Sequence, residues 1–196
     1  MSSLVVSGDT SGSVTIAAPA VAGTPTLTLP TTSGTILTSA STINAITSGT
    51  AQASTSGTSI DFTGIPSGVK RVTVMFSGVS TNGSSVVQLQ IGAGSVTTSG
   101  YLGAAFVSNT NASMSTGFLT SSSAAAGDTR YLIATLATLG SNIWVYSFSG
   151  GYGNGAYTAY GGGGLTLGGT LDRVRITTVN GTDAFDAGSI NILYES

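Results

Sequence analysis

The chain has 196 residues, of which only 6% are charged, and its formal net charge is −2. Globular proteins average about 25% charged residues, so this chain is unusually poor in charge. A protein without a positively charged surface does not attract the phosphates of nucleic acids, and we therefore expect no nucleic-acid partner. Neither cysteine nor histidine occurs, which excludes disulfides, thiol nucleophiles, Cys-ligated zinc and histidine-based acid–base chemistry. We therefore expect no cofactor.

The mean hydropathy of +0.37 is high for a chain with so few charges. Soluble monomers normally keep a mixed charged surface, so the protein either enters a membrane or buries its surface in an assembly. The most apolar stretches, 131–139 and 143–148, are far shorter than the ~20 residues of a membrane-spanning helix. We therefore expect no membrane partner. Because the N-terminus lacks the pattern of a signal peptide, we expect assembly in a cytoplasm.

Residues 1–40 carry an extended pattern. Val14 and Ile16, and then Leu27 and Leu29, alternate with Ser and Thr at a period of two, and prolines and glycines separate these pieces. This spacing predicts short strands. A segment of this size buries too little apolar surface to fold alone, so we expect it to order against other chains.

Residues 41–57 consist mainly of Ser, Thr, Ala and Gly. This composition is typical of a flexible linker. The alternative is a short stem in which Ile43 and Ile46 meet their copies at an oligomer axis.

Residues 58–196 are the predicted folded domain. The sequence predicts no helix of any length there, and Asn82-Gly83 is a strong hairpin-type turn signal. Short strands at regular spacing, separated by Gly, Asn and Ser, predict an all-β fold, an antiparallel β-sandwich of jelly-roll kind. The strands are expected at 71–76, 86–91, 104–108, 114–118, 131–136, 143–148, 173–178 and 189–194.

Two groups of residues resemble a known class of proteins. The first comprises 8–24 (GDTSGSVTIAAPAVAGT), 26–30 (TLTLP) and 34–38 (GTILT). It resembles a segment near the N-termini of bacteriophage tail-fibre and other virion fibre proteins, where it attaches the fibre to the particle. The resemblance implies a particle-anchoring role for Val14, Ile16, Pro19, Leu27, Leu29, Pro30, Ile36 and Leu37.

The second group comprises 60–66 (IDFTGIP), 72–74 (VTV), 88–92 (QLQIG) and 100–101 (GY). It resembles the distal β-sandwich domain of phage fibre and appendage proteins. Together the two resemblances imply a homotrimer in the virion, attached to capsid, neck or tail proteins by its N-terminus. The chain lacks an extended shaft, which favours a short fibre, an adaptor or a decoration of the capsid or tail.

The Gly-rich stretch 150–161 is the candidate ligand or receptor surface. It contains Tyr152, Asn154, Tyr157 and Tyr160. Tyrosine offers rigid amphipathic contact area and glycine lets a ligand approach the backbone, which suits a host surface glycan. The alternative is a long β–β loop whose tyrosines pack on the domain or on a neighbouring subunit.

Trp144 and Tyr146 lie on a strand pattern and are expected in the core or at an interface. Residues 161–164 are four glycines, but they lack the Lys-Ser/Thr ending and following helix of a phosphate loop. Asn180, Asp183 and Asp186 offer oxygen ligands to calcium. Because Asn180-Gly181-Thr182-Asp183 is also a turn-former, we predict no metal site.

The acidic residues decide whether glycan cleavage is expected, because that reaction needs two carboxylates. Asp61 and Asp172 lie beside basic residues in strand patterns, where structural ion pairs are expected. We therefore predict that the chain is not an enzyme. Three hypotheses remain in order: a structural virion protein, a host-glycan-binding fibre tip, and a polysaccharide depolymerase.

Overall fold

The computed structural model describes residues 3–7, 13–17, 21, 23–24, 46–153, 155 and 157–196. The chain divides into two compact units, Met1–Thr42 and Ile43–Ser196. In the first unit, β1 (Ser3–Ser7) and β2 (Ser13–Ala17) form an antiparallel pair with Leu4 opposite Ile16. The strand predicted around Val14 and Ile16 is thus confirmed. The other predicted anchoring residues, Pro19, Leu27, Leu29, Pro30, Ile36 and Leu37, lie outside the described residues.

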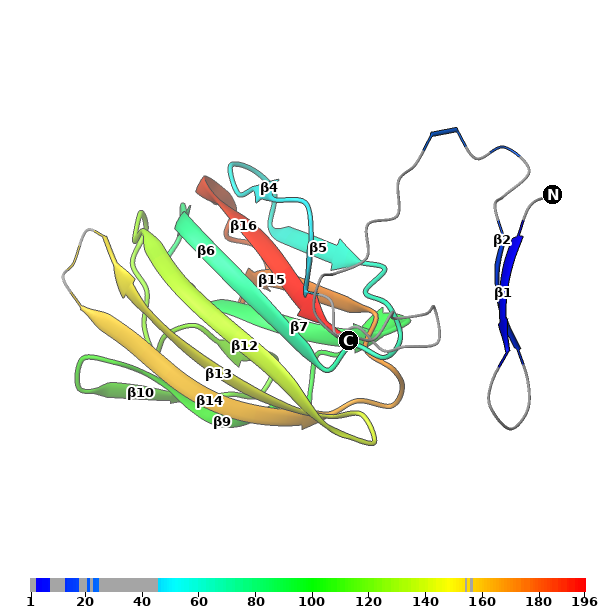
Figure 1. Cartoon of the computed structure of the whole chain (residues 1–196). Helices are drawn as coiled ribbons and strands as arrows, with labels where there is room; N and C mark the ends of the chain where they lie inside the picture. Colours follow the sequence, from blue (N-terminus) through cyan, green and yellow to red (C-terminus); the bar gives the residue numbers. More distant parts are fainter. Residues whose placement is uncertain are drawn as a thin grey trace. The chain divides into compact units, whose positions relative to one another are not determined.

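The second unit consists of two antiparallel sheets (Figure 1). The larger sheet has the order β10 (Thr110–Ser113), β9 (Leu102–Val107), β14 (Thr158–Thr166), β13 (Ile143–Tyr152), β12 (Arg130–Gly140), β6 (Arg71–Thr81), β16 (Phe185–Glu195) and β3 (Ile46–Ser48), and β4 (Gln52–Ala53) also pairs with β16. The smaller sheet has the order β11 (Phe118–Leu119), β7 (Val87–Ala93), β15 (Arg173–Thr178) and β5 (Ser59–Thr63), with β8 (Ser95–Val96) paired to β7.

The predicted all-β, antiparallel architecture is confirmed. No helix occurs among the described residues, and in that part of the chain no helix is long and apolar enough to cross a membrane. In Figure 1 the larger sheet lies in front, and β7 and β15 of the smaller sheet run behind it. Both sheets contribute side chains to a single buried core, so the domain is a β-sandwich.

Alternation along β13 shows how the larger sheet faces this core. On β13, Trp144, Tyr146 and Phe148 are buried, whereas Val145 and Ser147 between them are exposed. Successive side chains of a strand point to opposite faces, so this alternation gives the sheet one inner and one outer face. Burying each large apolar side chain contributes about 1.5–3 kcal/mol. Trp144 and Tyr146 are therefore core residues, one of the two placements that their pattern allowed.

Glycines on the inner face make room for the aromatic rings. Gly161 and Gly163 of β14 lie opposite Phe148 and Tyr146 of β13 in the register. A Cβ atom on Gly161 would lie 2.6 Å from the Phe148 ring. The space holds a series of packed rings: Tyr101 meets Phe118 edge to face with a centroid distance of 4.7 Å, and Phe118–Tyr146 (4.5 Å) and Tyr146–Phe148 (5.7 Å) are stacked.

Two connections near β6 and β12 use different turn chemistry. Ser141 and Asn142 join β12 to β13, and both have positive φ, 50° and 61°, as a two-residue type I′ hairpin requires. Asn82-Gly83, which the sequence marks as a hairpin turn, instead carries the chain from β6 in the larger sheet to β7 in the smaller one. Its geometry is set by Asn82, whose Oδ1 accepts a hydrogen bond from the Ala184 amide (2.9 Å).

Three segments differ from the sequence expectation. Of residues 41–57, predicted as linker or stem, 46–48 and 52–53 pair with β16 and form the edge of the larger sheet; main-chain pairing needs no side-chain pattern. The strand expected at 114–118 is absent, because those residues mostly connect β10 to β11. The Gly-rich stretch 150–161 is no long loop, because β13 continues to Tyr152 and β14 begins at Thr158.

Candidate functional site

The ends of β13 and β14 bring two of the predicted ligand-surface residues together. Tyr152 is the last residue of β13, and its amide donates to the carbonyl of Tyr157 (3.1 Å). Their ring centroids lie 5.9 Å apart at 59°. Tyr160 lies elsewhere, on the outer face of β14, where it stacks on Phe106 with a centroid distance of 5.4 Å. Asn154 lies outside the described residues.

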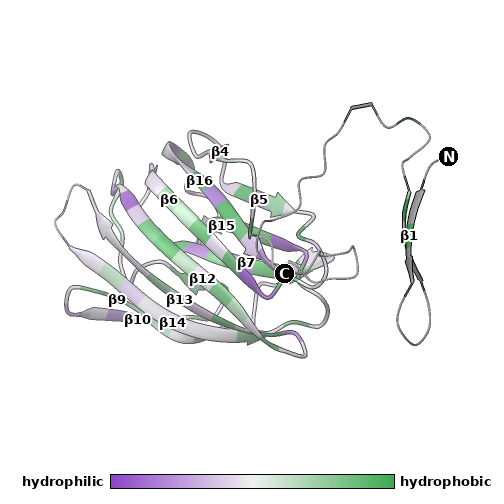
Figure 2. Ribbon diagram, viewed as in Figure 1, coloured by the Kyte–Doolittle hydropathy of each residue, from purple (hydrophilic) through white to green (hydrophobic). Residues whose placement is uncertain are grey.

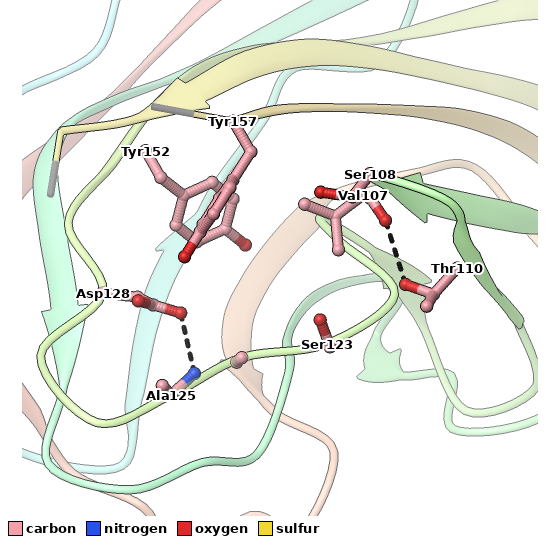
Figure 3. Close-up of a pocket in the computed structure, with 9 residues that line it drawn as sticks. Val107, Ser108, Thr110, Ser123, Ala125, Asp128, Tyr152 and Tyr157 are labelled. Atoms are coloured by element: carbon pink, nitrogen blue, oxygen red, sulfur yellow. Dashed lines mark hydrogen bonds between the residues drawn. The ribbon is translucent and has the colours of Figure 1, made fainter. Parts of the chain in front are cut away.

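Tyr152 and Tyr157 form one wall of a pocket of about 270 Å³ (Figure 3). The opposite wall comes from the end of β9, the start of β10 and the connection between β11 and β12. We call this the tyrosine pocket. Its lining residues are Val107, Ser108, Thr110, Ser123, Ala124, Ala125, Asp128, Tyr152 and Tyr157.

Two polar groups of the tyrosine pocket have unused hydrogen-bonding capacity. The hydroxyl of Tyr152 is buried, and it has no hydrogen-bond partner among the described residues. Asp128 is half-buried, and its Oδ2 accepts from the Ala125 amide (2.7 Å). The other carboxylate oxygen, Oδ1, makes no hydrogen bond within the described part of the chain. Both groups are therefore free to bind a ligand.

Arg130 supports this pocket from inside the sandwich. Its side chain is fully buried, and its Nη1 donates to the carbonyl oxygen of Asp128 (3.1 Å). Its guanidinium carbon lies 5.4 Å from the centre of the Tyr152 ring. The Nε and Nη2 atoms have no hydrogen-bond partner in the part of the chain that the structure describes. Arg130 thus contacts two pocket residues, and among the described residues no salt bridge to it is found. Sequence reasoning missed it, since alternation alone does not mark a buried arginine.

Arg130→Met is expected to leave the free energy of unfolding unchanged or to raise it by about 1 kcal/mol. Replacing a buried charge by an apolar side chain of similar size is often neutral or stabilising, because desolvation no longer opposes folding. Urea denaturation measures the change, with Arg71→Met at an exposed ion pair as the control. A loss of more than about 2 kcal/mol at Arg130 would contradict this account.

The outer face of the larger sheet is a second candidate surface. The register sets Met75, Ile133, Ser149, Tyr160 and Phe106 side by side across β6, β12, β13, β14 and β9. Around this row the large apolar side chains are exposed: Tyr131 is 54%, Ile133 55%, Val145 44%, Tyr160 54% and Leu102 73% accessible. Figure 2 shows hydrophobic residues along β6 and β12, and these belong to both the buried and the exposed face of the sheet. We call this surface the apolar face.

Charges are nearly absent from the apolar face. On its five strands the register places one charged side chain outward, Arg71 at one end, and this is ion-paired with Glu195 of β16 (2.7 Å). The smaller sheet differs, because its outer side carries Asp61 paired with Arg175 (2.7 Å). The two exposed sides of the sandwich therefore have opposite character.

The remaining acidic side chains serve the fold. The predicted ion pairs of Asp61 and Asp172 are confirmed, and the hydrogen bond from Arg173 (2.8 Å) lowers the pKa of the Asp172 carboxyl. A hydrogen bond from Asn180 (2.6 Å) likewise lowers the pKa of Asp183.

Asp186 contacts the hydroxyl of Ser80. Within the described ranges, no cluster of three or more acidic residues could hold a metal ion.

Comparisons with models of protein families, with curated proteins and with solved structures each found no match to this chain.

Proposed function

We propose that this chain is a non-enzymatic structural subunit of a bacteriophage particle, assembled in the host cytoplasm as a homotrimer. In this proposal residues 1–40 attach to a capsid, neck or tail protein, and the β-sandwich, of jelly-roll kind, is exposed outward as a short fibre, adaptor or decoration. The resemblance of short stretches between residues 8 and 38 and between 60 and 101 to virion fibre proteins supports a role in the phage particle. The separate N-terminal unit supports an anchor.

The observation that carries the proposal is the apolar face. The five strands have 11, 11, 10, 9 and 6 residues; at about 4.8 Å between strands and about 3.3 Å per residue they cover roughly 750 Å². A stable interface of standard size buries about 800 Å² on each partner. Thr73, Thr135, Ser147 and Ser149 make part of this area polar, and the exposed apolar side chains among them mark an interaction site. Copies of the chain suit this face, because a neutral surface meets its own copy without charge repulsion.

The placement of the acidic residues supports a non-enzymatic role. Asp61, Asp172 and Glu195 are ion-paired, and Asp183 and Asp186 accept hydrogen bonds from neighbouring segments. Asp128 lines the tyrosine pocket, but no second acidic residue lines it within the described ranges. A glycan-cleaving site needs a general acid and a nucleophile or base facing a common substrate. Carboxylates engaged in ion pairs and turns are poorly suited to that task.

Ile133→Lys is expected to turn the trimer into a folded monomer. Ile133 lies near the middle of the apolar face, where an ammonium group would lose its water without gaining a partner, at a cost of several kcal/mol. This corresponds to association weakened by at least about 100-fold. Light scattering on the full chain measures the mass. The matched control is Thr63→Lys, at an exposed strand position of the smaller sheet.

Two results would overturn the proposal. If the wild-type chain stays monomeric at micromolar concentration, the apolar face does not mediate self-association. If mass spectrometry does not detect the chain in purified phage particles, its assignment to the virion is wrong. Retention of the trimer in Ile133→Lys, with circular dichroism showing a folded protein, would place the interface elsewhere.

A further inference from the structure

We propose that the tyrosine pocket binds one neutral sugar ring through adjacent hydroxyl groups. This binding site is separate from the apolar face and does not depend on self-association. It is built from side chains at one end of the sandwich, and three features of the pocket point to the same ligand chemistry.

The first feature is the hydroxyl of Tyr152. The side chain is 6% exposed, lines the pocket and has no hydrogen-bond partner for its hydroxyl. In Figure 3 this hydroxyl points away from the strand, toward the space between Val107 and Asp128. A buried hydroxyl without a partner is destabilising, and a phenol both donates and accepts. A ligand hydroxyl in the pocket would satisfy it.

The second feature is the carboxylate of Asp128. Its Oδ2 is held by the Ala125 amide, and its backbone carbonyl is held by Arg130. The side chain is therefore fixed before a ligand arrives, which lowers the entropic cost of binding. Hydrogen bonds to a carboxylate are stronger than those between neutral groups. The unpartnered Oδ1 thus offers a strong acceptor for a sugar hydroxyl.

The third feature is the ring of Tyr157. It is 46% exposed at the pocket wall, tilted by 59° against the ring of Tyr152. Tyrosine combines an apolar ring with a polar tip, which matches a sugar ring with C–H groups on one face and hydroxyls at its edge. A volume of about 270 Å³ lies just below the range of about 300–1,000 Å³ for drug-sized ligands. One ring fits this size better than a chain.

Charge selects neutral sugars over acidic ones. Asp128 is the charged residue among those lining the pocket, and it would repel a sugar carboxylate or sulfate. The positive charge of Arg130 lies behind the ring of Tyr152 and does not line the pocket. Uronic and sialic acids are therefore disfavoured.

The test uses the full chain and four probes: the methyl glycosides of glucose, galactose and mannose, and glucuronic acid. Protein-detected NMR titration detects binding as weak as a Kd of about 10 mM. At least one neutral glycoside is expected to shift the signals of residues around the pocket. No shift with any neutral glycoside, or tighter binding of glucuronic acid, would overturn the proposal.

Tyr152→Phe and Asp128→Asn are expected to weaken that binding by about tenfold each. Tyr152→Phe removes only an oxygen that has no partner, so its free energy of unfolding should not fall. The matched control is Tyr160→Phe on the outer face, which should bind as the wild type does. Equal affinity in Tyr152→Phe and wild type would refute the assignment, whereas the mass of the protein tests the trimer independently.

Discussion

Gly163→Ala is expected to lower the free energy of unfolding by roughly 3 kcal/mol, as overpacking of a filled core does. A Cβ atom at Gly163 would lie 2.4 Å from the carbonyl oxygen of Leu102 and 2.9 Å from the sulfur of Met114. The Leu102 carbonyl belongs to β9, which pairs with β14. It can move only by disturbing the backbone of the sheet, so the clash is not relieved by rotation of a side chain.

The neighbouring glycine provides a matched control. Gly164 faces the other side of β14, and a Cβ atom there would meet its nearest atom, the Trp144 carbonyl oxygen, at 3.4 Å. Gly164→Ala is therefore expected to stabilise the protein by about 0.5 kcal/mol, because it restricts the unfolded chain. Urea denaturation of both variants measures the difference. Equal effects at the two positions would show that the inner face is less tightly packed than described.

Alkaline pH is expected to destabilise the domain through two buried tyrosines. Burial raises the pKa of Tyr101 from 10.0 to about 12, and burial also raises the pKa of Tyr146 well above its ordinary value. Above pH 10 the unfolded chain releases these protons while the folded chain retains them. The folded state then binds more protons, so stability is complete below pH 10 and falls as the pH rises.

The expected loss from Tyr101 is roughly 2–3 kcal/mol between pH 10 and 12, and Tyr146 adds to it. Urea denaturation at a series of pH values measures this slope. In Tyr146→Phe the slope should be shallower, because the variant has one tyrosine fewer to titrate. A free energy of unfolding that stays constant from pH 9 to about 11.5 would contradict the burial of both hydroxyls.

The buried arginine and the unpartnered tyrosine hydroxyl occur at the same end of the sandwich. Arg130 contacts both Asp128 and Tyr152, and we expect its charge to add no stability that an apolar side chain would lack. Residues that cost stability and persist are frequent at binding sites. If Arg130→Met keeps its stability but loses the affinity for neutral sugars, Arg130 acts as a positioning residue for the pocket.

Alternation determined most of the architecture from the sequence alone. Strands such as β15 and β13 were predicted because their apolar side chains recur at a period of two, and such a pattern buries one face only in a sheet. Composition likewise excluded cysteine and histidine chemistry. The ion pairs of Asp61 and Asp172 were expected because the partners lie in or beside neighbouring strand patterns.

Tertiary structure alone decided the rest. The sequence did not predict β14, because its glycines carry no apolar pattern. Their role is visible only in the fold, where the rings of Tyr146 and Phe148 on the paired strand β13 occupy the space that the glycines leave. β3 and β4 were missed because an edge strand is held by its backbone, whatever its side chains. The tyrosine pocket joins β9, β10, the connection after β11 and the end of β13. Because these side chains are far apart in the sequence and meet only in the folded protein, no local sequence pattern predicts the pocket.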